Sequence, residues 1–313
     1  MIATTLVLLP LFFVMGVGFF AGRTQRLDTH HMTGINRVLI DFTLPAALFT
    51  GTVQTPRDEL LRHAPLLFAL LLVFVGFWLL GNFIARVLFH HHAGAAVLQA
   101  TAFAFPNTGF MGVPILGGLF GASSVVTVAM ATVLGTLVFI PSAVIILEIM
   151  HSAQHHHELH WRTIVFDAFG NAARAPLVWA PILGAVLVLA GITLPREILN
   201  MLNLLGGVTS GLAMFAAGLV LAAYRLRVNF EIVVNTFLKM FAQPLAMLLL
   251  VRALGIADPL AQQGVILSAL PTPVLSTILA ARYGTYQSEA SSTLVLTSVA
   301  LLAMLPLWRI VLG

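Results

Sequence analysis

Long apolar segments separated by short polar links constrain the fold of this chain more than any single motif does. Each segment has roughly the ~20 residues that a helix needs to cross a bilayer. Hydrophobic residues occupy 59% of the 313 positions and charged residues only 8%, which is too apolar for a soluble core. The sequence therefore predicts an all-α polytopic membrane protein. Ten spans are predicted, at approximately 2–22, 33–51, 65–88, 95–117, 123–149, 174–192, 198–223, 230–252, 261–281 and 289–311.

The composition also excludes several classes of protein. The chain has no cysteine, which excludes disulfides, thiol catalysis and cysteine metal sites. The net charge of +4 comes from arginines scattered between spans, so no nucleic-acid partner is expected. No basic region precedes the first apolar run, and 2–22 is therefore expected to be a retained span rather than a cleaved signal peptide.

The fourth predicted span is interrupted. Pro106 and Pro114 each remove a backbone donor and clash with the preceding turn, while Gly109 and Gly112 add backbone freedom. Non-helical backbone at membrane depth is tolerated only where protein buries it or where it lines a cavity. The segment 102–121 is therefore a candidate binding site, and a kinked helix without a ligand is the alternative.

A second interrupted segment, 268–277, occupies the corresponding place in the second half of the chain. A shift of 165 residues places Pro106 on Pro271. The same shift also superposes Ala104 on Ala269, Ser123 on Ser288, Thr132 on Thr297, Leu137 on Leu302 and Pro141 on Pro306. Two successive groups of five spans must have opposite topologies because five is odd. The pattern predicts two inverted repeats, with interrupted spans four and nine forming the site of a transporter. Chance alignment is the alternative.

The distribution of arginines predicts the orientation in the membrane. Cytoplasmic links of membrane proteins carry an excess of basic residues. The odd-numbered links and their edges carry Arg23, Arg26, Arg37, Arg86, Arg162, Arg174, Arg225, Arg227 and Arg282, against Arg57, Arg62, Arg196, Arg252 and Arg309 in the even-numbered links and the C-terminus. The odd links are therefore expected in the cytoplasm and both termini outside.

Several motifs resemble those of a known family of carriers. They are Asp41–Phe49 in span two, Phe105–Ile115 in span four, Pro176–Pro181 in span six, Phe237–Pro244 in span eight and Ala269–Pro271 in span nine. Across essentially the whole chain, the sequence resembles the auxin efflux carrier family, which includes plant PIN-FORMED carriers and bacterial organic-acid permeases. The stretch from Asp41 to Pro56 is most similar to the bacterial malonate-carrier branch.

The resemblance implies an elevator-type carrier. A scaffold of spans 1, 2, 6 and 7 would hold a sliding transport domain of spans 3–5 and 8–10, with spans 4 and 9 crossing at their breaks. Residues 1–150 would form the first repeat, 151–173 a cytoplasmic link and 174–313 the second repeat. Related proteins also imply a homodimer through the scaffold. The residue pair Pro271 and Pro273 departs from many relatives, in which small residues follow a single proline.

Free amides and positive helix ends at the crossing suit a carboxylate. The expected substrate-binding residues are Pro106, Asn107, Thr108, Gly109, Pro271 and Thr272, together with Lys239. The alternative for the polar members is that they cap the broken backbone themselves.

Two ionisable residues lie at membrane depth, where charges are costly and usually functional. Asp41 and Lys239 are predicted at similar depths in spans two and eight. One alternative is that the two residues form a structural pair. A second is that Lys239 attracts the anion and Asp41 is a coupling site for a proton or another cation. A third is that one of them lies at the membrane–water interface. Gln243 is a second candidate for the coupling ion.

Other polar residues have simpler interpretations. Gln99, Gln263 and Gln243 are expected mainly to form hydrogen bonds between helices. The histidine clusters His90–His92 and His155–His157 are expected in solvated loops, with metal binding or pH sensing as alternatives.

Secondary transport is the function that these patterns favour. An enzyme would need a catalytic constellation inside the spans, a receptor would normally add a soluble domain, and a channel remains an alternative. No phosphate-binding Gly-x-x-x-x-Gly-Lys-Ser/Thr motif occurs, so no cofactor is expected and the electrochemical gradient would drive transport. The sequence predicts a carrier of a small organic anion in a bacterial inner membrane. Malonate is the specific expectation, with malate or an aromatic acid as alternatives, and a proton is favoured over sodium.

Overall fold

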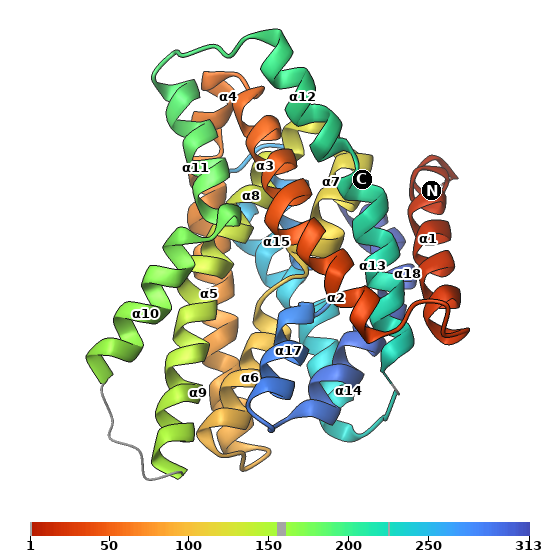
Figure 1. Cartoon of the computed structure of the whole chain (residues 1–313), viewed down its shortest axis with the longest axis vertical. Helices are drawn as coiled ribbons and strands as arrows, with labels where there is room; N and C mark the ends of the chain where they lie inside the picture. The colour runs from red at the N-terminus through yellow and green to blue at the C-terminus, as the bar shows by residue number, and fades with distance from the viewer. Residues whose placement is uncertain (1, 155–160, 225) are drawn as a thin grey trace.

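The computed structural model describes residues 2–154, 161–224 and 226–313, and every regular element within these ranges is a helix (Figure 1). The elements up to residue 154 are α1 (Ile2–Arg23), α2 (Thr29–Val38), η1 (Leu39–Thr43), α3 (Leu44–Val53), α4 (Arg57–Arg62), α5 (Ala64–Val87), α6 (Ala93–Ala104), η2 (Thr108–Gly112), α7 (Val113–Phe120), η3 (Ala122–Ser124), α8 (Val125–Leu134), η4 (Gly135–Phe139) and α9 (Ile140–Gln154). The later elements are α10 (Trp161–Arg174), α11 (Pro176–Leu189), α12 (Arg196–Gly207), α13 (Thr209–Ala223), α14 (Phe230–Phe237), η5 (Leu238–Ala242), α15 (Gln243–Ala253), α16 (Leu260–Ser268), α17 (Val274–Arg282) and α18 (Gln287–Leu312).

Six helical stretches in the described part of the chain are long and apolar enough to cross a membrane. They are Arg57–Val87, Ala93–Phe120, Ala122–Met150, Arg196–Ala223, Phe230–Ala253 and Gln287–Leu312. A seventh is added if α10 and α11, which meet at 55°, form one bent span. The prediction of a polytopic helical membrane protein is therefore confirmed in outline, whereas the number of ten spans stays a prediction.

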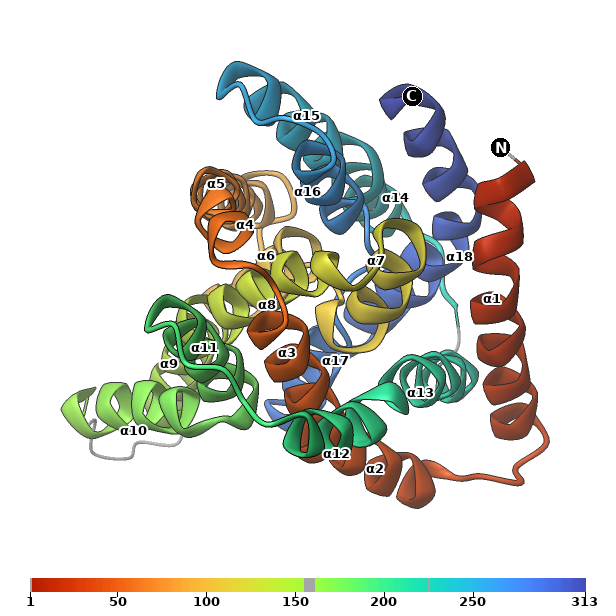
Figure 2. The same cartoon turned by 90° about the horizontal axis from the view of Figure 1, so that it is seen from above.

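Two groups of helices pack mainly among themselves. In the first group, α1 packs along α13, and α3 packs against α11 and α12. Figure 2 shows this group along one side of the molecule, beside the second group. In the second group, α6 packs against α5, α9, α17 and α18, and α15 packs against α5 and α16. Contacts of η2 and α7 with α13, of α7 with α1, and of α8 with α3 and α11 join the two groups.

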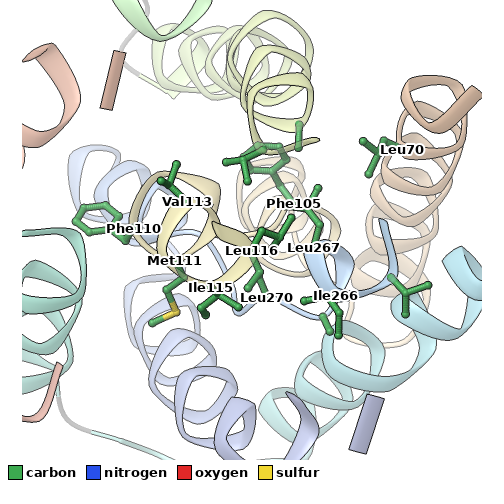
Figure 3. Packing of buried hydrophobic residues seen from close by; sticks show 14 of the residues in the cluster. Leu70, Phe105, Phe110, Met111, Val113, Ile115, Leu116, Ile266, Leu267 and Leu270 are labelled. Atoms are coloured by element: carbon green, nitrogen blue, oxygen red, sulfur yellow. The ribbon is translucent and has the colours of Figure 1, made fainter. Parts of the chain in front are cut away.

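The largest cluster of buried apolar side chains surrounds the two interrupted segments. Phe105 and Leu270 lie in the two interruptions, and Leu116 of α7 and Leu267 of α16 lie in the helices beside them (Figure 3). Leu70 of α5 belongs to the same cluster. The irregular backbone is thus buried in protein, as non-helical backbone at membrane depth requires.

A proline follows each π-helical turn that the structure describes. η1, η2, η4 and η5 end two residues before Pro45, Pro114, Pro141 and Pro244, respectively. A proline in a helix has no N–H and its ring clashes with the carbonyl four residues earlier. The wider turn accommodates that ring and lets the helix continue with a kink.

Pro244 cannot donate a backbone hydrogen bond to the carbonyl oxygen of Met240, which is bonded by a side chain instead. Met240 precedes Pro244 by four residues, and its carbonyl oxygen accepts a hydrogen bond from Nε1 of Trp308 at 3.0 Å. Trp308 is a buried residue of α18. The bond therefore attaches α18 to the kink of the eighth predicted span.

The described part of residues 151–173, predicted as a cytoplasmic link between the two repeats, is helical, and its role as a link stays a prediction. α10 occupies Trp161–Arg174, and α9 continues to Gln154. Phe166 and Phe169 of α10 are exposed, and the helix has polar residues between its apolar ones. α10 was not predicted from the sequence, because a partly polar helix has too few apolar residues to be recognised as a membrane span. The predicted cluster His155–His157 lies outside the described residues.

Replacing Trp308 by Phe tests the bond to the Met240 carbonyl. The Trp308→Phe variant keeps an aromatic ring but leaves a buried carbonyl without its donor, which costs about 1–3 kcal/mol. We expect a lower thermal unfolding temperature in detergent. Trp161→Phe on exposed α10 is the control and should leave that temperature unchanged. Equal unfolding temperatures for both variants would contradict this account of the kink.

Candidate functional site

The two interrupted segments contact each other through their backbones. α6 ends at Ala104 and η2 begins at Thr108, while α16 ends at Ser268 and α17 begins at Val274. Between these ends, the amide of Asn107 donates a hydrogen bond to the carbonyl oxygen of Pro271 at 2.9 Å. The two breaks that the sequence predicted therefore lie side by side. We call this contact the crossing.

Two polar side-chain atoms at the crossing have no hydrogen-bond partner. Asn107 is 3% exposed and Thr272 is fully buried, yet Nδ2 of Asn107 and Oγ1 of Thr272 are both unpaired. The backbone amide of Thr272 is satisfied, because it donates to Oγ1 of Thr297 at 3.2 Å. Eight other buried side-chain atoms in the described part of the chain are also unpaired. What distinguishes these two is their place in the two breaks, where one ligand could satisfy both.

The other predicted residues of the crossing shape its backbone. The carbonyl oxygen of Pro106 accepts a hydrogen bond from the amide of Thr108 at 2.8 Å, which forms a tight turn. Gly109 is only partly buried and lies near Leu44 of α3, which belongs to the first group of helices. Thr108 is buried in this turn. The crossing is closed to solvent in this conformation, since its polar side chains are almost completely covered.

Lys239 of η5 and Gln243 of α15 lie against the C-terminal ends of α6 and α16, at the two breaks. Nζ of Lys239, a fully buried residue, donates to Oε1 of Gln243 at 2.6 Å and to the carbonyl oxygen of Ser268 at 3.1 Å. Nε2 of Gln243 donates to the carbonyl oxygen of Ala104 at 2.5 Å. The pair therefore joins the last carbonyl of α16 to the last carbonyl of α6. Helix–helix hydrogen bonding by Gln243 is confirmed.

The structure does not bring Asp41 and Lys239 together. Asp41 is exposed on the protein surface, and no ion pair or hydrogen bond joins it to Lys239 among the described residues. The hypothesis of a structural pair is therefore wrong for this conformation. Both residues lie in π-helical turns, η1 and η5, and the helical rotation at these turns was not readable from the sequence.

A polar cluster that the sequence analysis missed lies beyond Lys239 on α14. Oε1 of Glu231 is within 2.9 Å of Nε2 of His91 and accepts from the hydroxyl of Tyr286 at 2.6 Å. Nδ2 of Asn235 donates a hydrogen bond to the hydroxyl of Tyr286 at 3.0 Å, and Oδ1 of Asn235 accepts one from Nε2 of Gln99 at 2.8 Å. Burial, together with the Glu231 carboxylate, raises the pKa of Tyr286 well above its ordinary value, so the hydroxyl remains a donor at neutral pH.

This cluster corrects the expectation that the histidines of residues 90–92 are simply solvated. His91 is partly buried against Glu231, although His90 is exposed. The signal in the sequence was the spacing of Glu231, Asn235, Lys239 and Gln243, which recur every four residues on one face of a helix. Within the described ranges, no group of three or more His, Asp or Glu side chains is arranged to hold a metal ion.

The remaining glutamines hold helices together as predicted. Gln99 of α6 donates to Asn235 of α14, and Gln263 of α16 accepts from Thr127 of α8 at 2.6 Å. These bonds surround the crossing without taking up the unpaired atoms of Asn107 and Thr272. The arrangement as a whole, with discontinuous helices meeting inside an apolar bundle, is that of a membrane carrier.

Comparison with known proteins agrees with this class. The family model described as "Membrane transport protein" matches residues 3–309. The chain is 31% identical over 304 residues to "Uncharacterized transporter YfdV" of Escherichia coli (strain K12), covering 96% of this chain and 95% of that protein. It is 25% identical over 296 residues to the "Putative malonate transporter" of Rhizobium meliloti (strain 1021), covering 93% of this chain and 90% of that protein. It is 24% identical over 317 residues to "Uncharacterized transporter MJ1031" of Methanocaldococcus jannaschii, covering 98% of each chain.

The chain therefore belongs to the membrane transport protein family, and it is an integral membrane protein. The match over nearly the whole chain confirms the resemblance to the auxin efflux carriers. The family and these relatives are transporters, which favours transport over catalysis.

Packing beside the crossing gives a testable consequence. Gly135 of η4 lies against the ring of Phe105, which begins the interruption, and a Cβ at position 135 would overlap that ring. Overpacking of this kind typically costs about 1–3 kcal/mol. We expect Gly135→Ala to lower the unfolding temperature and to displace Phe105.

Gly117 of α7 provides the matched control, because a Cβ there would meet nothing within 4 Å. Gly117→Ala should be neutral, or stabilising by about 0.5–1 kcal/mol because alanine loses less backbone entropy. Thermal unfolding of both variants measures the difference. A Gly135→Ala variant as stable as the Gly117→Ala variant would overturn this description of the packing.

Proposed function

We propose that the protein is a secondary active carrier of a small organic anion, with a dicarboxylate such as malonate as the substrate. The observation that carries this proposal is the pair of buried, unpaired side-chain atoms at the crossing, Nδ2 of Asn107 and Oγ1 of Thr272. Both can donate a hydrogen bond to a carboxylate oxygen. Hydrogen bonds to a charged group contribute about 1.5–3 kcal/mol each.

The electrostatics of the crossing support an anion. η2, which continues into α7, begins at the first break, and α17 begins at the second. Helix N-termini carry unpaired amides and partial positive charge. Pro106, Thr108, Gly109 and Pro271 would shape the pocket through their backbones. Lys239 would add positive potential from the far side of the breaks without touching the substrate.

Packing supports an elevator arrangement of ten spans in two inverted repeats, 1–150 and 174–313. In this assignment, α1, α2 with α3, α11, and α12 with α13 form the scaffold. The remaining spans form the transport domain, which would slide along the scaffold. The separate packing of the two groups is what such a division requires. The crossing belongs to the transport domain and faces α3 and α13 of the scaffold.

Relatives support the choice of substrate only at a distance, since one of them bears the name of a malonate transporter at 25% identity. A proton is the proposed coupling ion ahead of sodium, with Asp41 as the candidate for its site. Gln243 has no titratable group and is a candidate only for sodium, the alternative ion. Asp41, exposed on the membrane-spanning surface of the isolated chain, would need water or a second subunit beside it. A homodimer through the scaffold in a bacterial inner membrane, with both termini outside, completes the proposal.

Transport by purified protein in proteoliposomes tests the function and the site together. Radiolabelled malonate is supplied with a proton gradient or a sodium gradient imposed separately. We expect saturable uptake that responds to the proton gradient. Asn107→Ala and Thr272→Val should lower kcat/KM about tenfold or more, as expected for the loss of one hydrogen bond to a charged group.

Thr101→Val is the matched control for Thr272→Val. Thr101 is also buried, but its hydroxyl is satisfied within its own helix by the carbonyl oxygen of Val97, at 2.7 Å. The control should retain normal uptake. Absence of uptake under either gradient would discard malonate, and uptake unaffected by Asn107→Ala and Thr272→Val would discard the site.

A further inference from the structure

Two half-helices end at one buried, hydrogen-bonded pair of side chains, Lys239 and Gln243. α6 ends at Ala104 and α16 ends at Ser268, and the carbonyl oxygens of these two last residues are held by Lys239 and Gln243. The C-terminal end of a helix carries partial negative charge, because its last carbonyls have no partner within the helix. Lys239 therefore lies where two negative helix ends converge.

No acidic side chain balances Lys239 among the described residues. α6 and α16 carry no ionisable residue at all. The charged residues on the other elements that pack against η5 are Glu231 of α14, Arg252 of α15, and Glu289 and Arg309 of α18. Glu231 is bonded to His91 and Tyr286, and neither it nor Glu289 forms an ion pair with Lys239. The acceptors of the ammonium group are therefore carbonyl oxygens only.

Carbonyl oxygens at the C-terminal ends of broken helices are the ligands that hold Na⁺ or a proton in carriers with discontinuous spans. We propose that the Lys239 ammonium is a tethered cation, which permanently fills a cation site formed by the carbonyl ends of α6 and α16. Gln243 relays the ammonium to the Ala104 carbonyl, while the Ser268 carbonyl is bonded directly. The wild-type protein consequently has no sodium site at the crossing, and removal of the side chain opens one.

This inference deepens the proposed function and rests on it for one consequence only. If the protein is a carrier, the tethered charge moves with the transport domain and sodium does not drive uptake. The cation site itself is a property of the folded protein. It can therefore be tested without any substrate.

Thermal unfolding of purified protein in NaCl or in choline chloride, at equal ionic strength, measures cation binding. The wild type should unfold at the same temperature in both salts. Lys239→Ser removes the ammonium and leaves space, so this variant should be destabilised in choline and recover saturably as Na⁺ is added. Lys239→Met removes the charge but fills the space, and it should be destabilised equally in both salts.

Gln263→Ser is the matched control, because Gln263 of α16 is also buried and polar but has Thr127 as its partner. It should lose stability equally in both salts. Purification of each variant is run in parallel in the two salts. Recovery of folded Lys239→Ser only in sodium would support the proposal, and recovery in neither salt would overturn it, because Na⁺ then fails to replace the ammonium.

Two further results would overturn the tethered cation. One is a Lys239→Ser variant that folds but responds to Na⁺ no more than Gln263→Ser does. The other is a saturable sodium response of the wild type itself. Malonate uptake by the same preparations separates this proposal from the proposed function. A sodium-dependent unfolding temperature of Lys239→Ser without malonate uptake by the wild type would uphold the cation site and discard malonate.

Discussion

Backbone groups that are freed inside a membrane must find partners within the protein, and this requirement shapes the centre of the molecule. Each unsatisfied group at that depth costs several kcal/mol. The interruptions of α6–α7 and α16–α17 free amides and carbonyls near the middle of the bundle. The amide of Asn107 is satisfied by the carbonyl of Pro271, and the carbonyls of Ala104 and Ser268 are satisfied by Gln243 and Lys239. The buried polar residues around the crossing follow from these needs.

The same requirement explains how much of the fold was predictable. Apolar length and prolines are local features, so the helical membrane class and the two interruptions could be predicted from the sequence. Each π-helical turn precedes a proline, but Pro181 and Pro306 lie inside α11 and α18 without such a turn, so proline alone does not predict one. The effect of these turns on side-chain direction was not predictable, and Asp41 accordingly faces outward although its predicted depth resembles that of Lys239. α10 was missed because an amphipathic helix lacks the apolar run by which spans are recognised.

The candidate site was predictable where its residues lie in the breaks themselves. Asn107, Thr108 and Thr272 stand beside prolines, and an interrupted helix makes its polar residues candidates for binding. The partners of Lys239 were not predictable, because one is a backbone carbonyl 29 residues away and its identity depends on the packing of α16. The bond between His91 and Glu231 spans 140 residues. Only the four-residue spacing along α14 and α15 marked the face on which such contacts form.

At the crossing, the carbonyl ends of the helices have hydrogen-bond partners within the protein, whereas buried polar atoms beside the amide ends lack them. The carbonyl ends of α6 and α16 have donors from Lys239 and Gln243, which are fully buried and belong to the protein itself. On the amide side, where η2 and α17 begin, two buried side-chain atoms have no partner. A group that is always satisfied contributes stability in every state, whereas a group without a partner in the empty protein becomes satisfied only when a ligand binds. In the proposed carrier, selectivity for an anion would therefore lie with Asn107 and Thr272, and the positive charge of Lys239 would support binding without competing for the same space.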